Sequence, residues 1–201
     1  NNGEMKNSGF ELELGYQGNI GQFIYGISAN GSAIKNKLIN IGNEAGEEVL
    51  ESLGAGGVGG FVKASNGEVW PYFYGYKVAG ILQTDAEANA YNAKFGENAV
   101  PGDVAFMDIA GGPDGKPDGQ ITEADKVKIG KGMPDFTLGL NLNAEWKNFD
   151  LSMFFQGSFG NDIYDISFRG DIPAMNRPAW FLDRWTGEGS TNEYPLITIA
   201  N

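Results

Sequence analysis

The sequence predicts an all-β fold made of long antiparallel strands that are joined by tight turns. Apolar residues occupy every second position through residues 136–146, and a second alternating run covers residues 149–159. Such alternation is typical of a strand with one apolar face. Each run is longer than the usual strand of about five or six residues. If residues 147–148 form a two-residue turn, Trp146 pairs with Phe149 and both apolar stripes lie on one side of the sheet.

The N-terminal part of the chain repeats this design. Residues 10–17 alternate between apolar and polar side chains, a turn rich in Gly and Asn follows, and residues 23–30 alternate again. We therefore expect two hairpins of long strands, one within residues 1–35 and the other within residues 135–160.

Alternating strands occur both in soluble β-sandwiches and in transmembrane β-barrels, and three details favour the barrel. The strands reach the roughly 9–11 residues that a tilted membrane strand requires. Aromatic residues flank the turns at Tyr16, Phe23, Trp146 and Phe149, where a barrel places its interfacial girdle. Both tight turns lie at one end of the strands, whereas the long link 36–134 lies at the other. The predicted fold class is thus a segment of a transmembrane antiparallel β-barrel with long extracellular loops.

Composition excludes several classes of chemistry. The 201 residues include no His and no Cys, so disulfides, Cys-based zinc sites and His- or Cys-dependent nucleophilic catalysis are excluded. The formal net charge of -12 also argues against a nucleic acid as partner, because phosphate binding requires a basic surface. Carboxylate-based catalysis is left, but no pair of acidic residues is singled out by the sequence. We expect no enzyme.

The link 36–134 is predicted to be an extracellular excursion with an aromatic segment. Residues 42–133 contain 14 acidic residues and 7 lysines, so the excursion holds much of the negative charge of the chain. The aromatic residues considered for substrate binding are Trp70, Tyr72, Tyr74 and Tyr76. They form either a loop that buries its own aromatic side chains or a stacking platform for a sugar or peptide.

An acidic Asp-Gly loop in the excursion suggests a calcium site. The segment "DGKPDGQITEAD" at residues 114–125 places oxygen-bearing residues at most ligand positions of a twelve-residue calcium loop, with Gly119 at the sharp turn. The candidate calcium ligands are Asp108, Asp114, Asp118, Gln120, Thr122 and Asp125. Lys116 departs from the pattern, because an ammonium group repels a cation. The alternative is an acidic turn whose Asp side chains accept hydrogen bonds from their own backbone.

Several ordered segments resemble one known family. They are "GEMKNSGFELELGY", "FYGYKVAGILQT", "PGDVAFMDI", "PDFTLGLNLNAEWKNFDLSMFFQGSFGNDIY" and "FLDRWTGEGSTNEYP". Together they resemble the C-terminal part of the barrel of SusC/RagA-type TonB-dependent outer-membrane transporters of Bacteroidetes. The resemblance implies a 22-stranded barrel with an N-terminal plug, located in the cell outer membrane.

The same resemblance implies a function in nutrient uptake. It implies import of oligosaccharides or peptides together with a SusD-like surface lipoprotein, and contact with outer-membrane lipid. Coupling to TonB would use parts of the transporter that this chain lacks. Residues 161–201 would form a further extracellular loop segment. The alternative from another class is a secreted calcium-dependent carbohydrate-binding β-sandwich module.

Overall fold

The structure, a computed structural model, describes residues 3–51, 59–165 and 176–197. The chain divides into two compact units. The first unit comprises Asn1–Leu53, Gly60–Phe73 and Gly130–Tyr164. The second comprises Gly54–Gly59, Tyr74–Ile129 and Asp165–Asn201. Parts of the predicted C-terminal loop segment, residues 166–175 and 198–201, lie outside the described residues.

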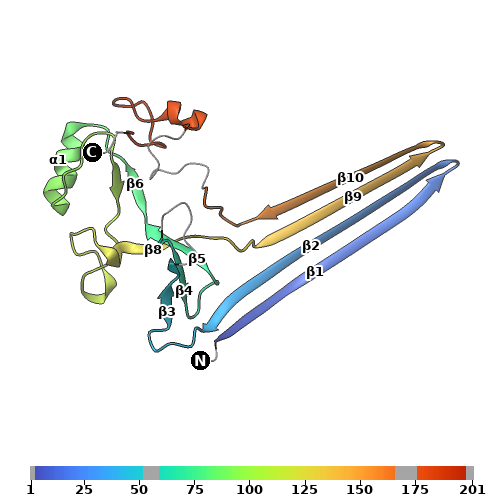
Figure 1. Ribbon diagram of the computed structural model, residues 1–201, viewed down its shortest axis with the longest axis horizontal. Helices are drawn as coiled ribbons and strands as arrows, with labels where there is room; N and C mark the ends of the chain where they lie inside the picture. The colour runs from blue at the N-terminus through green and yellow to red at the C-terminus, as the bar shows by residue number, and fades with distance from the viewer. Residues whose placement is uncertain (1–2, 52–58, 166–175, 198–201) are drawn as a thin grey trace. The chain divides into compact units, whose positions relative to one another are not determined.

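Four long strands form the main sheet of the first unit (Figure 1). They are β1 (Glu4–Ile20), β2 (Phe23–Asn40), β9 (Phe136–Trp146) and β10 (Phe149–Phe159). Their order is β1-β2-β9-β10, and every neighbouring pair is antiparallel. Trp146 pairs with Phe149 across the turn, as the sequence predicts. β1 with β2 and β9 with β10 thus form two antiparallel hairpins, which pair with each other through β2 and β9.

The register places the apolar stripes of all four strands on one face. One row across the sheet joins Tyr16, Ile27, Leu142 and Met153. The row beside the two turns joins Ile20, Phe23, Trp146 and Phe149. Because successive side chains of a strand point to opposite faces, the alternate positions form a separate, mostly polar face. Both tight turns lie at the same end of the sheet, as predicted.

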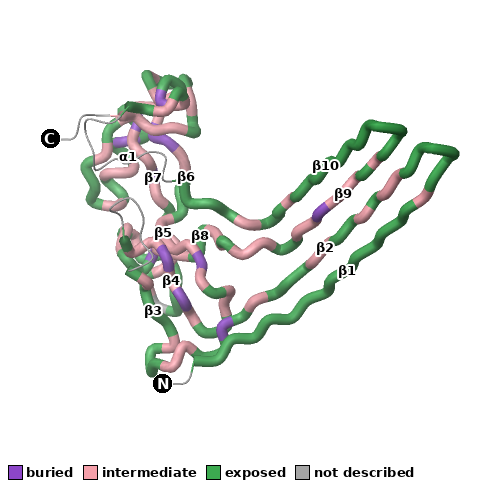
Figure 2. The backbone as a smooth tube through the Cα atoms, turned by 45° about the vertical axis from the view of Figure 1, so that its right-hand side comes forward, coloured by how far each residue is buried: buried purple, intermediate pink, exposed green. Residues whose placement is uncertain are grey.

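β1 and β10 are exposed along most of their length (Figure 2), and many apolar side chains of the sheet are exposed within its unit. Phe10 retains 66% of its accessible surface and Phe149 retains 75%. In a β-sandwich such side chains would be buried against a second sheet. The observed sheet is open among the described residues, with β1 and β10 at its edges. Within this unit, the exposure argues against the sandwich.

The N-terminal hairpin is longer than its sequence pattern indicates. β2 continues to Asn40, past the predicted boundary at residue 35, and β1 begins at Glu4. The extension lacks clean alternation and is held by cross-strand polar contacts. Asn36 pairs with Asn7, and its side-chain NH₂ group donates a 2.7 Å hydrogen bond to the side-chain oxygen of Asn7. Main-chain pairing therefore continues where apolar periodicity ends.

The residues between the two hairpins form smaller sheets. β3 (Glu47–Val49), β4 (Val62–Ser65), β5 (Tyr72–Tyr76) and β8 (Lys126–Lys131) are ordered β3-β4-β5-β8. β6 (Val78–Ile81) pairs with β7 (Val104–Phe106) in a two-stranded sheet. In the first unit, Val62, Ala64 and Tyr72 are buried. The strand content agrees with the predicted all-β class.

One α-helix, α1 (Asp85–Phe95), is added to this β-structure. Thr84 caps it by accepting a 3.2 Å hydrogen bond from the backbone N–H of Glu87, and Gly96 ends it at φ 73°. Its buried Ala88 packs with Leu82 and Ala105 in the core of the second unit. Short 3-10 helices cover Pro113–Gly115, Glu123–Asp125 and Ala179–Asp183. Among the described residues, no helix combines the length and apolarity needed to cross a membrane.

Candidate functional site

The polar face of the main sheet offers hydroxyl and amide groups. The Ser32 and Thr137 hydroxyl oxygens lie 2.8 Å apart across β2 and β9. The Ser152 hydroxyl donates a 2.8 Å hydrogen bond to the Asn143 side-chain oxygen across β9 and β10. The sheet thus combines an exposed apolar face with a hydrophilic one, which is the pairing expected of a wall between lipid and water.

The aromatic residues of the predicted platform have different environments. Tyr72 is only 6% exposed, and its hydroxyl oxygen lies 2.8 Å from that of Ser65. Its position agrees with the alternative in which the segment buries its own aromatics. Trp70 is 39% exposed, and its backbone N–H donates to the Asn36 side-chain oxygen at 2.8 Å. Trp70 is therefore anchored through its backbone while its ring stays accessible.

Trp70 and Tyr72 line an apolar hollow of about 320 Å³ in the first unit. The lining residues are Val62, Trp70, Pro71, Tyr72, Phe73, Gly132 and Met133. No Asp, Glu, Lys or Arg is among them, so the hollow suits the face of a sugar ring or an apolar peptide side chain. Of its aromatic residues, Trp70 is exposed, Phe73 is half-buried and Tyr72 is buried.

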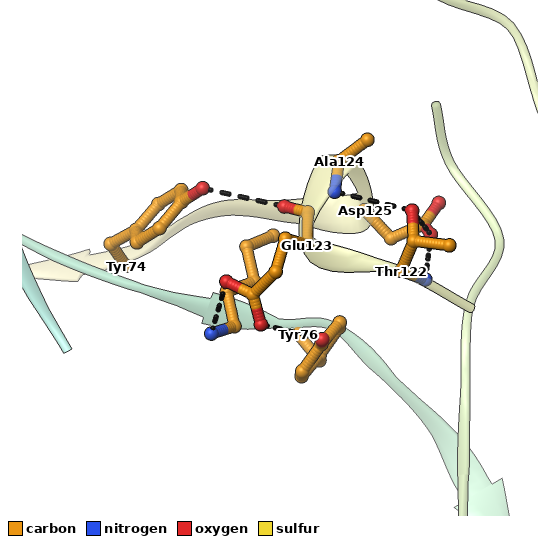
Figure 3. A network of polar contacts seen from close by, with 7 residues as sticks. Tyr74, Tyr76, Thr122, Glu123, Ala124 and Asp125 are labelled. Atoms are coloured by element: carbon orange, nitrogen blue, oxygen red, sulfur yellow. Dashed lines mark hydrogen bonds and ion pairs between the residues drawn. The ribbon is translucent and has the colours of Figure 1, made fainter. Parts of the chain in front are cut away.

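Tyr74 and Tyr76 meet at Glu123 in the second unit (Figure 3). The Tyr76 hydroxyl donates to the Glu123 carboxylate at 3.2 Å, and the Tyr74 hydroxyl donates to the Glu123 carbonyl oxygen at 3.5 Å. Lys126 binds the same carboxylate at 2.7 Å. The hydrogen bond from Lys126 lowers the pKa of Glu123, and burial together with that carboxylate raises the pKa of Tyr76. These contacts keep Glu123 ionised and fix the Tyr76 ring.

Asp125 is the fully buried charged residue of the acidic loop, with 0% of its surface exposed. One of its carboxylate oxygens accepts hydrogen bonds from the backbone N–H groups of Ile109 and Ala110, at 2.7 and 3.0 Å. The other accepts from the backbone N–H of Thr122 at 2.7 Å. These bonds, first of all the one from Ala110, lower the pKa of Asp125 despite its burial. Asp125 therefore joins two stretches of the loop as an anion.

Among the other candidate calcium ligands, Asp108, Asp118 and the Thr122 hydroxyl also accept hydrogen bonds from backbone N–H groups. Asp108 accepts from the N–H groups of Asp118 and Gly119 at 3.2 and 2.8 Å, and Asp118 accepts from that of Gln120 at 2.9 Å. Asp114 is exposed. Within the described part of the chain, no three His, Cys, Asp or Glu side chains are grouped closely enough to hold a metal ion. The calcium site therefore stays a prediction from the sequence.

A calcium titration tests whether the acidic loop binds the ion, as its residue types predict, or keeps its carboxylates hydrogen-bonded to backbone N–H groups. Because the Asp108 and Asp125 carboxylates are already satisfied by backbone N–H groups, we expect millimolar calcium to leave the amide protection of residues 108–125 unchanged from that in a chelator. The measurement is hydrogen exchange on the native polypeptide that carries this chain. Calcium-dependent protection confined to this loop would restore the sequence-based calcium hypothesis.

The second unit contains a further hollow, of about 600 Å³, that the sequence did not reveal. Its lining comprises Tyr76, Tyr91, Glu97, Asn98, Ala99, Asp103, Val104, Phe106, Ile121 and Pro195. The sequence does contain a local signal for α1, the helix beside this hollow. Thr84 and Glu87 have the spacing of a capping box, and Gly96 is a suitable C-terminal cap. These signals would have placed a helix whose end carries Glu97 and Asn98.

The comparisons with known proteins agree with this architecture. No protein-family model matches the chain. Over 99% of its length it is 29% identical to TonB-dependent receptor P3 of Formosa agariphila, and over 97% it is 29% identical to TonB-dependent receptor P26 of the same organism. It is also 27% identical to TonB-dependent receptor P39 of that organism over its whole length. These similarities confirm the resemblance to TonB-dependent receptors.

The fold also has a counterpart among solved structures. The chain matches the structure of the RagAB peptide transporter with a TM-score of 0.56 and 20% sequence identity, over 79% of this chain and 15% of that one. The likeness confirms the predicted fold of long antiparallel strands, whose sheets are open among the described residues. The chain spans only 19% of the length of receptors P3 and P26 and 22% of receptor P39.

Proposed function

We propose that this chain is part of an outer-membrane TonB-dependent transporter that imports peptides or oligosaccharides together with a SusD-like lipoprotein. The four-stranded sheet would form part of the transporter wall, with its apolar face toward lipid and its polar face toward a wet interior. The residues between the hairpins would meet the substrate and the lipoprotein at the cell surface.

One observation carries the proposal. The sheet exposes a continuous apolar face built from four strands in register, and the opposite face is mostly polar. An exposed apolar surface of this extent is unfavourable in water, so it is expected to be covered by lipid. Similarity to TonB-dependent receptors over nearly the whole chain supports the same location.

Two further observations support a binding role. The hollow at Trp70 offers an accessible aromatic residue and no acidic or basic side chain, which suits binding rather than bond cleavage. The comparison with the RagAB peptide transporter supports import with a lipoprotein partner of the SusD type. Energy for transport would come from TonB acting on other parts of the transporter.

Membrane fractionation tests the location. We expect the native polypeptide that carries this chain to be recovered in the outer-membrane fraction and to require detergent for extraction, because the apolar face of the sheet must be covered. Recovery as a soluble periplasmic or secreted species would contradict the proposal and would favour the sandwich module.

Substitution of Trp70 tests the binding role. We expect Trp70→Ala to weaken binding by about 3- to 10-fold, because the stacking contribution of one aromatic ring is lost. The readout is binding and uptake of a mixture of casein-derived peptides and of a linear malto-oligosaccharide series. Trp70→Phe, which keeps an aromatic ring, is the matched control. Equal binding by all three proteins for both probe classes would remove Trp70 from the site.

A further inference from the structure

We propose that the 600 Å³ hollow of the second unit binds the cationic side chain of a lysine- or arginine-containing peptide. The inference rests on the proposed function as an importer, and it narrows the substrate class to basic peptides. It concerns Tyr76, Tyr91, Glu97, Asp103 and Phe106, which line the hollow.

The aromatic side of the hollow is held in place by contacts within the unit. The rings of Tyr76 and Phe106 lie 5.3 Å apart between centroids. The Tyr91 hydroxyl accepts a 3.2 Å hydrogen bond from the backbone N–H of Phe106, so its own proton is free to be donated. Tyr76 is fixed at its far end by Glu123. A preformed aromatic wall of this kind attracts the methylene groups and the charge of a long cationic side chain.

The acidic side of the hollow is formed by the carboxylates of Glu97 and Asp103. The Glu97 side chain makes no hydrogen bond or ion pair with the described residues. One Asp103 oxygen accepts from the backbone N–H of Val100 at 2.9 Å, which leaves the other carboxylate oxygen available. Lys126 lies 5.2 Å from the Tyr76 ring centroid, but its ammonium group is bound to Glu123. The carboxylates of Glu97 and Asp103 are thus left without a positive partner in the described unit.

This combination favours an organic cation over other ligand classes. No Lys or Arg lines the hollow, so an anionic ligand would find no counter-charge and would be repelled by two carboxylates. Two carboxylates beside aromatic rings are too few oxygen ligands for a calcium ion. A neutral oligosaccharide could stack on the rings but would leave both carboxylates without a counter-charge. A lysine or arginine side chain can pack its methylene groups on the aromatic rings and pair its charge with the carboxylates.

The test measures binding of two short peptides to the native polypeptide in detergent. The peptides are Ala-Lys-Ala-Lys-Ala and its neutral counterpart Ala-Gln-Ala-Gln-Ala, each labelled for fluorescence anisotropy. We expect the basic peptide to bind more tightly and to lose affinity as salt rises. Glu97→Gln is expected to weaken the basic peptide by about 3- to 5-fold and to leave the neutral peptide unchanged. Glu188→Gln makes the same change of charge at an exposed residue that does not line the hollow, and it should alter neither peptide.

Each result supports or overturns the inference. Equal affinity for the two peptides, or no effect of Glu97→Gln on the basic one, would overturn it. Preferential binding of a neutral malto-oligosaccharide that is lost in Tyr76→Ala but not in Glu97→Gln would also overturn it, in favour of a sugar site. Outer-membrane fractionation of the same samples distinguishes a failure of the basic-peptide inference from a failure of the proposed transporter function. A protein that resides in the outer membrane but shows no charge preference would contradict only the inference.

Discussion

Leu142→Lys is expected to destabilise the membrane-inserted protein by about 2–4 kcal/mol, because it places an ammonium group on the proposed lipid-facing surface. Leu142 lies in the middle of β9, in a row with Ile27 and Met153 on the apolar face. The measurement is the urea dependence of folding of the native polypeptide into lipid vesicles, or the amount recovered folded in the outer membrane.

The neighbouring residue provides a matched control. Asn141 lies on the same strand but on the opposite face, in a row with Ser28 and Phe154. Asn141→Lys adds the same side chain toward the proposed wet interior, so we expect a far smaller loss of stability than for Leu142→Lys. Equal losses, or a larger loss for Asn141→Lys, would show that the apolar face is not the lipid-facing one.

Asp125→Asn is expected to destabilise the loop around Asp125 by about 3 kcal/mol. One carboxylate oxygen of Asp125 serves two backbone N–H groups, and the other serves that of Thr122. An amide keeps one oxygen but turns an NH₂ group toward one of these donors, so at least one buried N–H loses its acceptor. Hydrogen exchange of residues 109–110 and 122 should become about 100-fold faster if local opening controls exchange.

The pH dependence of the same amides gives an independent check. The folded-state pKa of Asp125 lies below the ordinary value of 3.8, so its stabilising effect is fully present above about pH 4. The effect is lost as the pH falls from 3.8 through the folded-state pKa. The parent protein should therefore lose protection of these amides in acid, whereas Asp125→Asn should lack this step. Asp114→Asn, at an exposed position of the same loop, should keep the step; a parent protein without the step would contradict the role assigned to Asp125.

Predictions from local sequence succeeded where one strand and its neighbour carry the same periodic pattern. Residues 136–146 and 149–159 alternate strictly, and the pairing of Trp146 with Phe149 followed from a two-residue turn. The alternation of apolar and polar residues fails beyond Asn30, so the sequence pattern does not predict that β2 continues to Asn40. There the strands are held by main-chain pairing and by contacts such as Asn36 with Asn7, which leave no apolar period.

Candidate site residues were harder to interpret, because their role depends on what lies opposite them in space. Tyr72 and Trp70 are two residues apart in one aromatic segment, yet one ring is buried and the other is accessible. In the sequence, Glu97 and Asp103 are isolated acidic residues that indicate no site. They line one hollow only because α1 and β7 bring them beside Tyr76 and Phe106.

The sequence by itself determined the long strands, their common apolar face and the resemblance to TonB-dependent receptors, because strand periodicity is a local property. The tertiary structure alone decided how the acidic loop uses its charges. Asp125 has the residue type and spacing of a calcium ligand, but the chain brings the backbone N–H groups of Ile109 and Ala110 to its carboxylate. A buried carboxylate must be satisfied by whichever donors the fold places around it, and here these are backbone amides.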